Sequence, residues 1–93
     1  MHVGALYVRL RIPSATSLKD KRQVVRSVLD RARSRFHLAA AEVGSNDLRQ
    51  IAELGFASVA NEAVAARAPL ETVLEALRSH PVAHLLEHEL DVT

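Results

Sequence analysis

A cluster of basic residues is the feature of this sequence that points most directly to a chemistry. Residues 17–36 hold seven of the chain's twelve Lys and Arg residues and only two acids, so this segment carries +5 while the whole chain carries +1. Cationic side chains pair with phosphates in salt-dependent contacts that are largely independent of nucleic-acid sequence. On a helix, four of the bases would fall within about 60° of one another. These candidate nucleic-acid-binding residues are Lys19, Arg22, Arg26 and Arg33.

Structured RNA or the ribosome is the expected partner of this stripe, and no sequence-specific DNA binding is expected. Arg31 and Arg35 would lie on the opposite flank of the same helix and could add phosphate contacts. The competing interpretation is that the charges only keep one helix face hydrated, because charge runs often do no more than that. The sequence leaves both interpretations open.

Base stacking on the sheet has weaker support. The stretch Gly55-Phe56-Ala57-Ser58-Val59 echoes part of the third-strand signature of RNA-recognition motifs. However, Leu54 stands where that signature has a basic residue, and Ser58 stands at the second aromatic position. Stacking needs aromatic faces that this segment lacks, so the sequence argues against it.

No reaction is indicated by the remaining chemical groups. His84 and His88 would share a strand face, but four residues of strand separate them by about 13 Å, which is too far for one metal ion. Nucleophile-elbow, dinucleotide-binding and Walker motifs are missing. We therefore identify no catalytic residue, no metal ligand and no cofactor, and favour a binding protein over an enzyme.

The periodicity of apolar residues indicates six elements that would position these groups. Leu6, Val8 and Leu10 alternate with other residues, as in a strand with one buried face. After Ser17 the apolar residues recur at three- and four-residue steps, as in an amphipathic helix that Ser17 would cap by accepting from the amide of Asp20. The predicted elements are a strand at 3–12, a helix at 17–36, strands at 37–43 and 51–60, a loop at 62–68, a helix beginning near Pro69 and halted by Ser79-His80-Pro81, and a strand at 83–92.

This order predicts one α+β domain over residues 1–93, with the ferredoxin-like βαββαβ arrangement. Its four-stranded antiparallel sheet would carry both helices on one face. The first and last strands would be antiparallel neighbours, so Arg9 and Arg11 would face the acids of the last strand across the open face. Those acids are Glu87, Glu89 and Asp91, and Leu86, Leu90 and Val92 are expected on the other face of that strand.

The open sheet face supplies the alternative function, a dimeric structural or protein-interaction module. We predict that Leu54 and Phe56 point outward and join Tyr7 in an interface, with Leu38 as a further member. The alternate residues Gly55, Ala57 and Val59 would then face the helices, and they are small enough to let the helices approach. A second copy would cover such a patch in a homodimer. The opposite orientation of the third strand would bury Phe56 under the helices. A small-ligand sensor is a third class, which no residue favours.

Composition and segment lengths set the expected location. The chain has no cysteine, which excludes disulfides, thiolate catalysis and cysteine-based zinc sites. Charged residues interrupt the apolar N-terminal run before it reaches signal-peptide or membrane-spanning length. We expect a cytoplasmic protein that does not enter a membrane.

Three segments resemble the YlxP-like family of small bacterial proteins. They are Ser17-Leu18-Lys19-Asp20-Lys21-Arg22, which is similar to the family's Ser-Leu-Lys-x-Lys-Arg helix opening, Ala41-Glu42-Val43, and Ala52-Glu53-Leu54-Gly55 followed by Asn61. The resemblance spans essentially the whole chain. It implies a ferredoxin-like fold and an association with translation, because the family's genes tend to lie beside those for translation initiation and ribosome maturation factors. It implies no catalytic residue.

Overall fold

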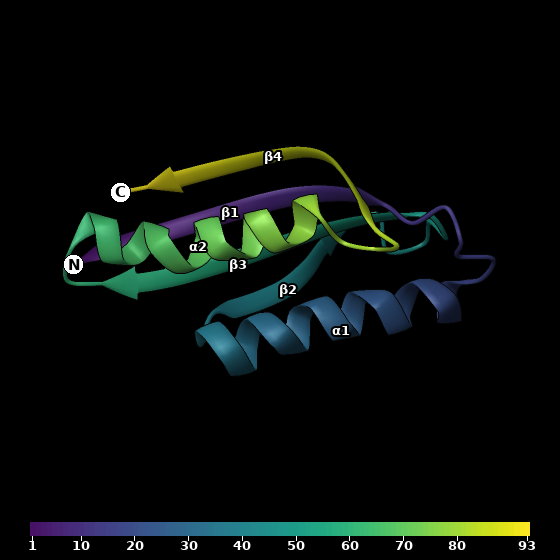
Figure 1. Ribbon diagram of the computed structural model, residues 1–93, viewed down its shortest axis with the longest axis horizontal. Helices are drawn as coiled ribbons and strands as arrows, with labels where there is room; N and C mark the ends of the chain where they lie inside the picture. The colour runs from purple at the N-terminus through teal and green to yellow at the C-terminus, as the bar shows by residue number, and fades with distance from the viewer.

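The computed structural model describes residues 1–93 and has the predicted order of elements (Figure 1). They are β1 (His2–Arg11), α1 (Leu18–Phe36), β2 (Ala39–Gly44), β3 (Ile51–Ala60), α2 (Ala63–Arg78) and β4 (His84–Val92). The strands form one antiparallel sheet in the order β2-β3-β1-β4. α1 contacts β2 and β3, while α2 contacts β1, β3 and β4. The ferredoxin-like prediction is confirmed.

β1 alternates between the core and the open face of the sheet, as its sequence predicts. Leu6, Val8 and Leu10 are buried, and Ile12 continues the buried row beyond the strand. The intervening side chains lie on the face that neither helix covers, because successive residues of a strand point to opposite faces. β1 lies between β3 and β4, so its pairing with them determines which of their side chains face the core.

α1 begins where the sequence predicts. Ser17 is the N-cap, and its hydroxyl accepts a hydrogen bond of 3.1 Å from the amide of Asp20. The Asp20 carboxylate in turn accepts from the backbone amide and the hydroxyl of Thr16, at 3.0 and 2.7 Å. The helix ends at His37, whose φ of 54° is left-handed and stops the helical hydrogen bonding. Neither helix is long and apolar enough to span a membrane.

α2 begins at Ala63, so the predicted loop at 62–68 and the predicted start at Pro69 are wrong. Alanine-rich sequence favours helix, and Ala66 is fully buried against the sheet, which adds packing to propensity. Pro69 lies inside the helix, where it cannot donate to the carbonyl of Ala65. Ala65 is exposed, so water can hydrate that carbonyl.

The predicted orientation of β3 is wrong. Leu54 is 0% exposed and Phe56 is 2% exposed, and both lie in the core under the helices. The cause is the register with β1, which pairs Val8 with Leu54 and Leu6 with Phe56, since directly paired residues share a face. Leu38 is buried as well. Leu54, Phe56 and Leu38 therefore cannot contribute to an interface on the open face.

The last strand confirms one prediction and corrects another. Arg9 pairs with Glu87 on the open face, with 3.8 Å between their charged atoms. The register shifts between Arg9 and Leu10, which leaves Leu86 as the extra residue of a bulge. Leu85 consequently packs against the core, whereas Leu86 is 47% exposed instead of sharing the inner face with Leu90.

Candidate nucleic-acid interface

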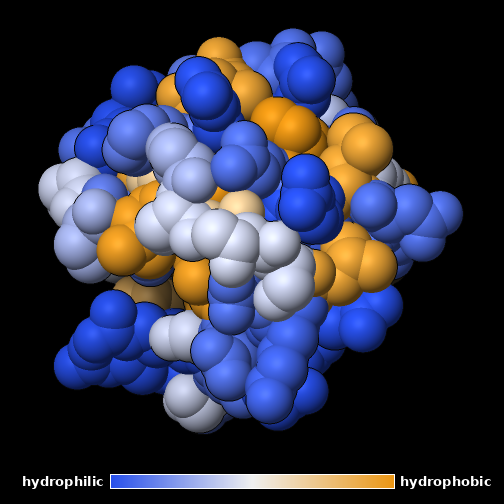
Figure 2. Space-filling view, turned by 90° about the vertical axis from the view of Figure 1, so that its right-hand side faces the viewer, coloured by the Kyte–Doolittle hydropathy of each residue, from blue (hydrophilic) through white to orange (hydrophobic).

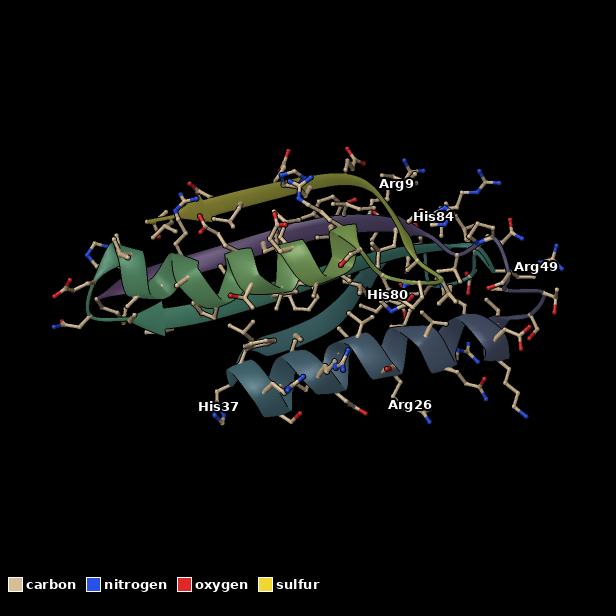
Figure 3. The ribbon with its side chains drawn as sticks, in the orientation of Figure 1. Arg9, Arg26, His37, Arg49, His80 and His84 are labelled. Carbon is tan, nitrogen blue, oxygen red and sulfur yellow. The ribbon has the colours of Figure 1, made fainter.

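Three of the four predicted binding residues form a free cationic row on α1. Lys19, Arg22 and Arg26 are exposed, and none of them forms an ion pair. The side chain of Arg26 points away from the sheet (Figure 3). Viewed from the end of the molecule where α1 begins, the lower part of the surface, where this helix lies, is mainly hydrophilic (Figure 2). These three residues are called the cationic row below.

Arg33 lies on the same flank but its guanidinium is already engaged. It pairs with Asp30 at 3.5 Å and donates a hydrogen bond to the carbonyl of Ala40 in β2. It therefore attaches the last turns of α1 to the edge strand of the sheet. Because of these contacts, Arg33 offers a partner less free charge than the cationic row does.

The acids of α1 do not neutralise the cationic row. Asp20 is held at the helix start by Thr16 and Ser17, and hydrogen bonds from Thr16 keep the pKa of its carboxyl below the usual range. Asp30 is paired with Arg33. Because both acids of the helix are bound to other groups, the positive charge of the row faces solvent.

Lys21 contributes to the +5 charge of residues 17–36 but is not available to a partner. Its side chain is 0% exposed, and its ammonium donates to the carbonyls of Ser45 at 2.8 Å and Ile51 at 3.0 Å. The carboxylate oxygen Oε2 of Glu42 lies 3.1 Å from the same nitrogen. That oxygen is buried without a hydrogen bond, so charge pairing with Lys21 offsets its burial.

The position of Lys21 contains a signal that sequence reasoning missed. At 100° per residue, Lys21 falls on the same helix face as Val25, Val28 and Leu29, which form the buried stripe. A lysine in an apolar stripe indicates a buried charge with partners. The second lysine of the helix-opening motif is therefore structural. Since Arg33 is also engaged, five of the seven bases in residues 17–36 remain without an ion pair.

The connection between β2 and β3 is tied to the start of α1 by this lysine. Ser45, whose carbonyl binds Lys21, also donates a hydrogen bond from its hydroxyl to Glu53. Glu53 accepts a second hydrogen bond from Tyr7, and the two bonds lower the pKa of its carboxyl. Gly44 packs directly on Glu53, where a Cβ would lie 2.5 Å from the carboxylate oxygen Oε2. The network holds the loop at 45–50 beside the N-terminal turns of α1.

Of the three predicted interface residues, only Tyr7 lies on the open face. Its hydroxyl donates to Glu53 at 2.6 Å, and this bond is the main cause that raises the pKa of Tyr7 to about 12. Beside it lies a shallow depression, here called the apolar depression, whose outward side chains are almost all small or apolar. The residues that line it on the open face are Ala5, Tyr7, Ala39, Ala41, Val43, Gly55 and Ala57.

The structure does not place potential metal ligands close together. No three His, Cys, Asp or Glu side chains are grouped so that they could hold an ion. The prediction that His84 and His88 share a strand face is wrong. The β-bulge at Leu86 lies between them, so His84 pairs with Arg11 of the open face and His88 pairs with Val8 of the core face.

Comparisons with known proteins connect the chain to proteins without an assigned activity. Residues 3–90 match the model of a family described as a protein of unknown function (DUF503). The chain is also 34% identical over 70 residues to an uncharacterized protein, YlxP, of Bacillus subtilis (strain 168). That alignment covers 75% of this chain and 76% of the relative. The YlxP-like resemblance is confirmed, and neither description assigns a chemistry.

Proposed function

This chain belongs to the DUF503 family of proteins of unknown function, and we propose that it is a non-enzymatic module that binds structured RNA through the cationic row of α1. The observation that carries the proposal is that Lys19, Arg22 and Arg26 are aligned, exposed and without a carboxylate partner. The association with translation genes that the resemblance implies makes ribosomal RNA the first RNA to test.

The placement of the row suits a polyanion. Its members lie on the first three turns of α1 and span about 10 Å along the axis. The N-terminal end of a helix carries a partial positive charge, which adds to that of the side chains nearby. Long cationic side chains on successive turns can reach separate phosphates, and double-stranded RNA is recognised mostly by shape and backbone contacts. The row therefore suits RNA without a need for base-specific groups.

Charge reversal on α1, compared with equal reversal on α2, tests the proposal. We expect the double variant Arg22→Glu and Arg26→Glu to bind a ribosomal RNA fragment at least about tenfold more weakly, because attraction to two phosphates becomes repulsion. Fluorescence anisotropy at constant salt measures the affinity.

The matched control is the double variant Arg67→Glu and Arg78→Glu on α2. Both arginines are partly exposed and pair with Glu71 and Glu75 of their own helix, so this variant has the same net charge without touching the row. Equal weakening by the two double variants would show that only total charge matters, and that result would refute a site on α1.

Self-association through the open sheet face is a second candidate function, favoured by the apolar depression. Val43 is 56% exposed and Val59 is 67% exposed on this uncovered face, so a second copy would remove apolar surface from water. Small residues let two sheets approach face to face, at about 10 Å between them. A dimer of this kind leaves α1 of both copies free, so it is compatible with RNA binding.

An acid placed in the apolar depression tests self-association. Ala41→Glu is expected to shift the protein to monomer in light scattering, because the carboxylate would be buried between two sheets without a partner. Ala65→Glu, an equally charged change on the exposed side of α2, should leave the mass unchanged. A wild-type monomer at high micromolar concentration would contradict this second function.

A further inference from the structure

A groove of about 550 Å³ lies between the two helices, on the side of the sheet opposite the apolar depression. Val28 and Phe36 of α1 and Val73 and Leu77 of α2 supply its apolar walls. Its volume is within the range of small-ligand sites, roughly 300 to 1,000 Å³. The groove is separate from the cationic row, which lies on the other flank of α1.

Arg31 is the only charged residue that lines the groove. It is exposed, and no carboxylate pairs with it, whereas its neighbour Arg33 is paired with Asp30. No acid lines the groove at all. An uncompensated guanidinium beside an apolar wall matches a ligand that carries one negative charge and an apolar body.

His80 supplies a second, fixed donor. Its Nδ1 accepts hydrogen bonds from the amides of Val82 at 3.2 Å and Ala83 at 3.0 Å, in the turn that leads into β4. Those two bonds fix the ring and place the imidazole hydrogen on Nε2, which has no protein partner. Figure 3 shows His80 between the end of α2 and α1.

The electrostatic surroundings of His80 agree with this arrangement. Burial, and then the positive charge of Arg31, lower the pKa of His80 below its usual 6.5. Near neutral pH the imidazole is therefore a neutral donor beside a cation. The two groups complement each other, since one offers charge and the other offers a directed N–H.

We propose that this groove is a binding site for a small amphiphilic carboxylate. Its head group is held by the guanidinium of Arg31 and by Nε2–H of His80, while its hydrocarbon body lies against Val28, Phe36 and Leu77. The proposal does not depend on RNA binding, because none of the residues of the cationic row lines the groove.

Titration with decanoate, and with decanol as the uncharged probe of equal chain length, tests the site by NMR. We expect decanoate to shift the ring signals of His80 and Phe36 and to bind more tightly than decanol. Arg31→Gln should weaken decanoate binding about tenfold and leave decanol binding unchanged, because a charge-assisted hydrogen bond is lost.

Arg35→Gln is the matched control, since it removes one exposed, unpaired charge from the same helix outside the groove. Ala76→Trp, an exposed position on the groove wall, should abolish binding of both probes by filling the space. The proposal is overturned if decanol binds as tightly as decanoate, if Arg35→Gln weakens decanoate as much as Arg31→Gln does, or if the shifts avoid His80 and Phe36.

Discussion

At the residue scale, Lys21 shows how one side chain links the sequence motif to the fold. Burial of an ammonium group is unfavourable by several kcal/mol unless its donors are satisfied and its charge is paired. Here two strong hydrogen bonds to Ser45 and Ile51, a longer one of 3.4 Å to Asn46 and the nearby carboxylate of Glu42 meet both conditions. The motif thus joins α1 to the β2–β3 connection.

Removal of this ammonium should be strongly destabilising. We expect Lys21→Met to lower the free energy of unfolding by about 3 to 5 kcal/mol, because the buried carboxylate oxygen of Glu42 and the carbonyls of Ser45 and Ile51 would lose their only cationic partner. Urea unfolding followed by circular dichroism measures the change. Lys19→Met, two residues earlier and exposed, should change stability by no more than about 0.5 kcal/mol. Equal stability of the two variants would contradict a structural role for Lys21.

At the element scale, two glycines lie on opposite faces of the sheet. Gly4 faces α2, and Gly55 lies on the open face. A Cβ on Gly4 would lie 2.9 Å from the Ala66 carbonyl oxygen of α2 and 2.7 Å from a Leu70 methyl group. A Cβ on Gly55 would lie 3.0 Å from a methyl group of Val43, which is exposed and free to move. The absence of a side chain at Gly4 therefore allows α2 to pack closely on β1. At Gly55 a Cβ would meet only a side chain and no backbone.

The two alanine substitutions should consequently differ in sign or size. Gly4→Ala is expected to destabilise the protein by about 1 to 3 kcal/mol, because the backbone of α2 must shift to admit the methyl group. Gly55→Ala is expected to be neutral or slightly stabilising, since alanine loses less conformational freedom in a strand than glycine does. Thermal unfolding of both variants measures this, and a Gly4→Ala protein as stable as the Gly55→Ala protein would refute the packing argument.

The elements that were predicted correctly are those with a strong local signal. Strict alternation in β1 and the Ser17 cap of α1 depend on neighbours within a few residues, so the sequence contains the necessary information. The orientation of β3 depends instead on its register with β1, which a weakly alternating strand of small residues does not reveal. The start of α2 was misplaced because Pro69 is a typical first-turn residue, while the burial of Ala66 that extends the helix is a tertiary effect.

The candidate site was predictable in part for the same reason. Helical angles place Lys19, Arg22 and Arg26 on one flank, and that inference needs only the period of the helix. The engagement of Arg33 depends on the Ala40 carbonyl of β2, and the helical period of α1 does not reveal where that strand lies. The groove beside Arg31 and His80 requires the packing of α1 and α2 on the sheet, and no local pattern indicates it.

At the scale of the whole molecule, the nearly neutral total charge conceals a separation of charge. α1 packs on β2 at one edge of the sheet, whereas the acids Glu87, Glu89 and Asp91 belong to β4 at the other edge (Figure 1). One acid, Glu87, is paired with Arg9, but Glu89 and Asp91 have no ion pair. A polyanion would therefore be attracted to the α1 side and repelled from the β4 side, which orients the protein during encounter.

The salt dependence of RNA affinity tests the central claim most directly. Three phosphate contacts from the cationic row predict that log K falls with log salt concentration with a slope of about −2 to −3. In the double variant Arg22→Gln and Arg26→Gln, loss of two contacts should bring that slope to about −1. A wild-type slope near zero, or a slope that the two substitutions leave unchanged, would contradict RNA binding by α1.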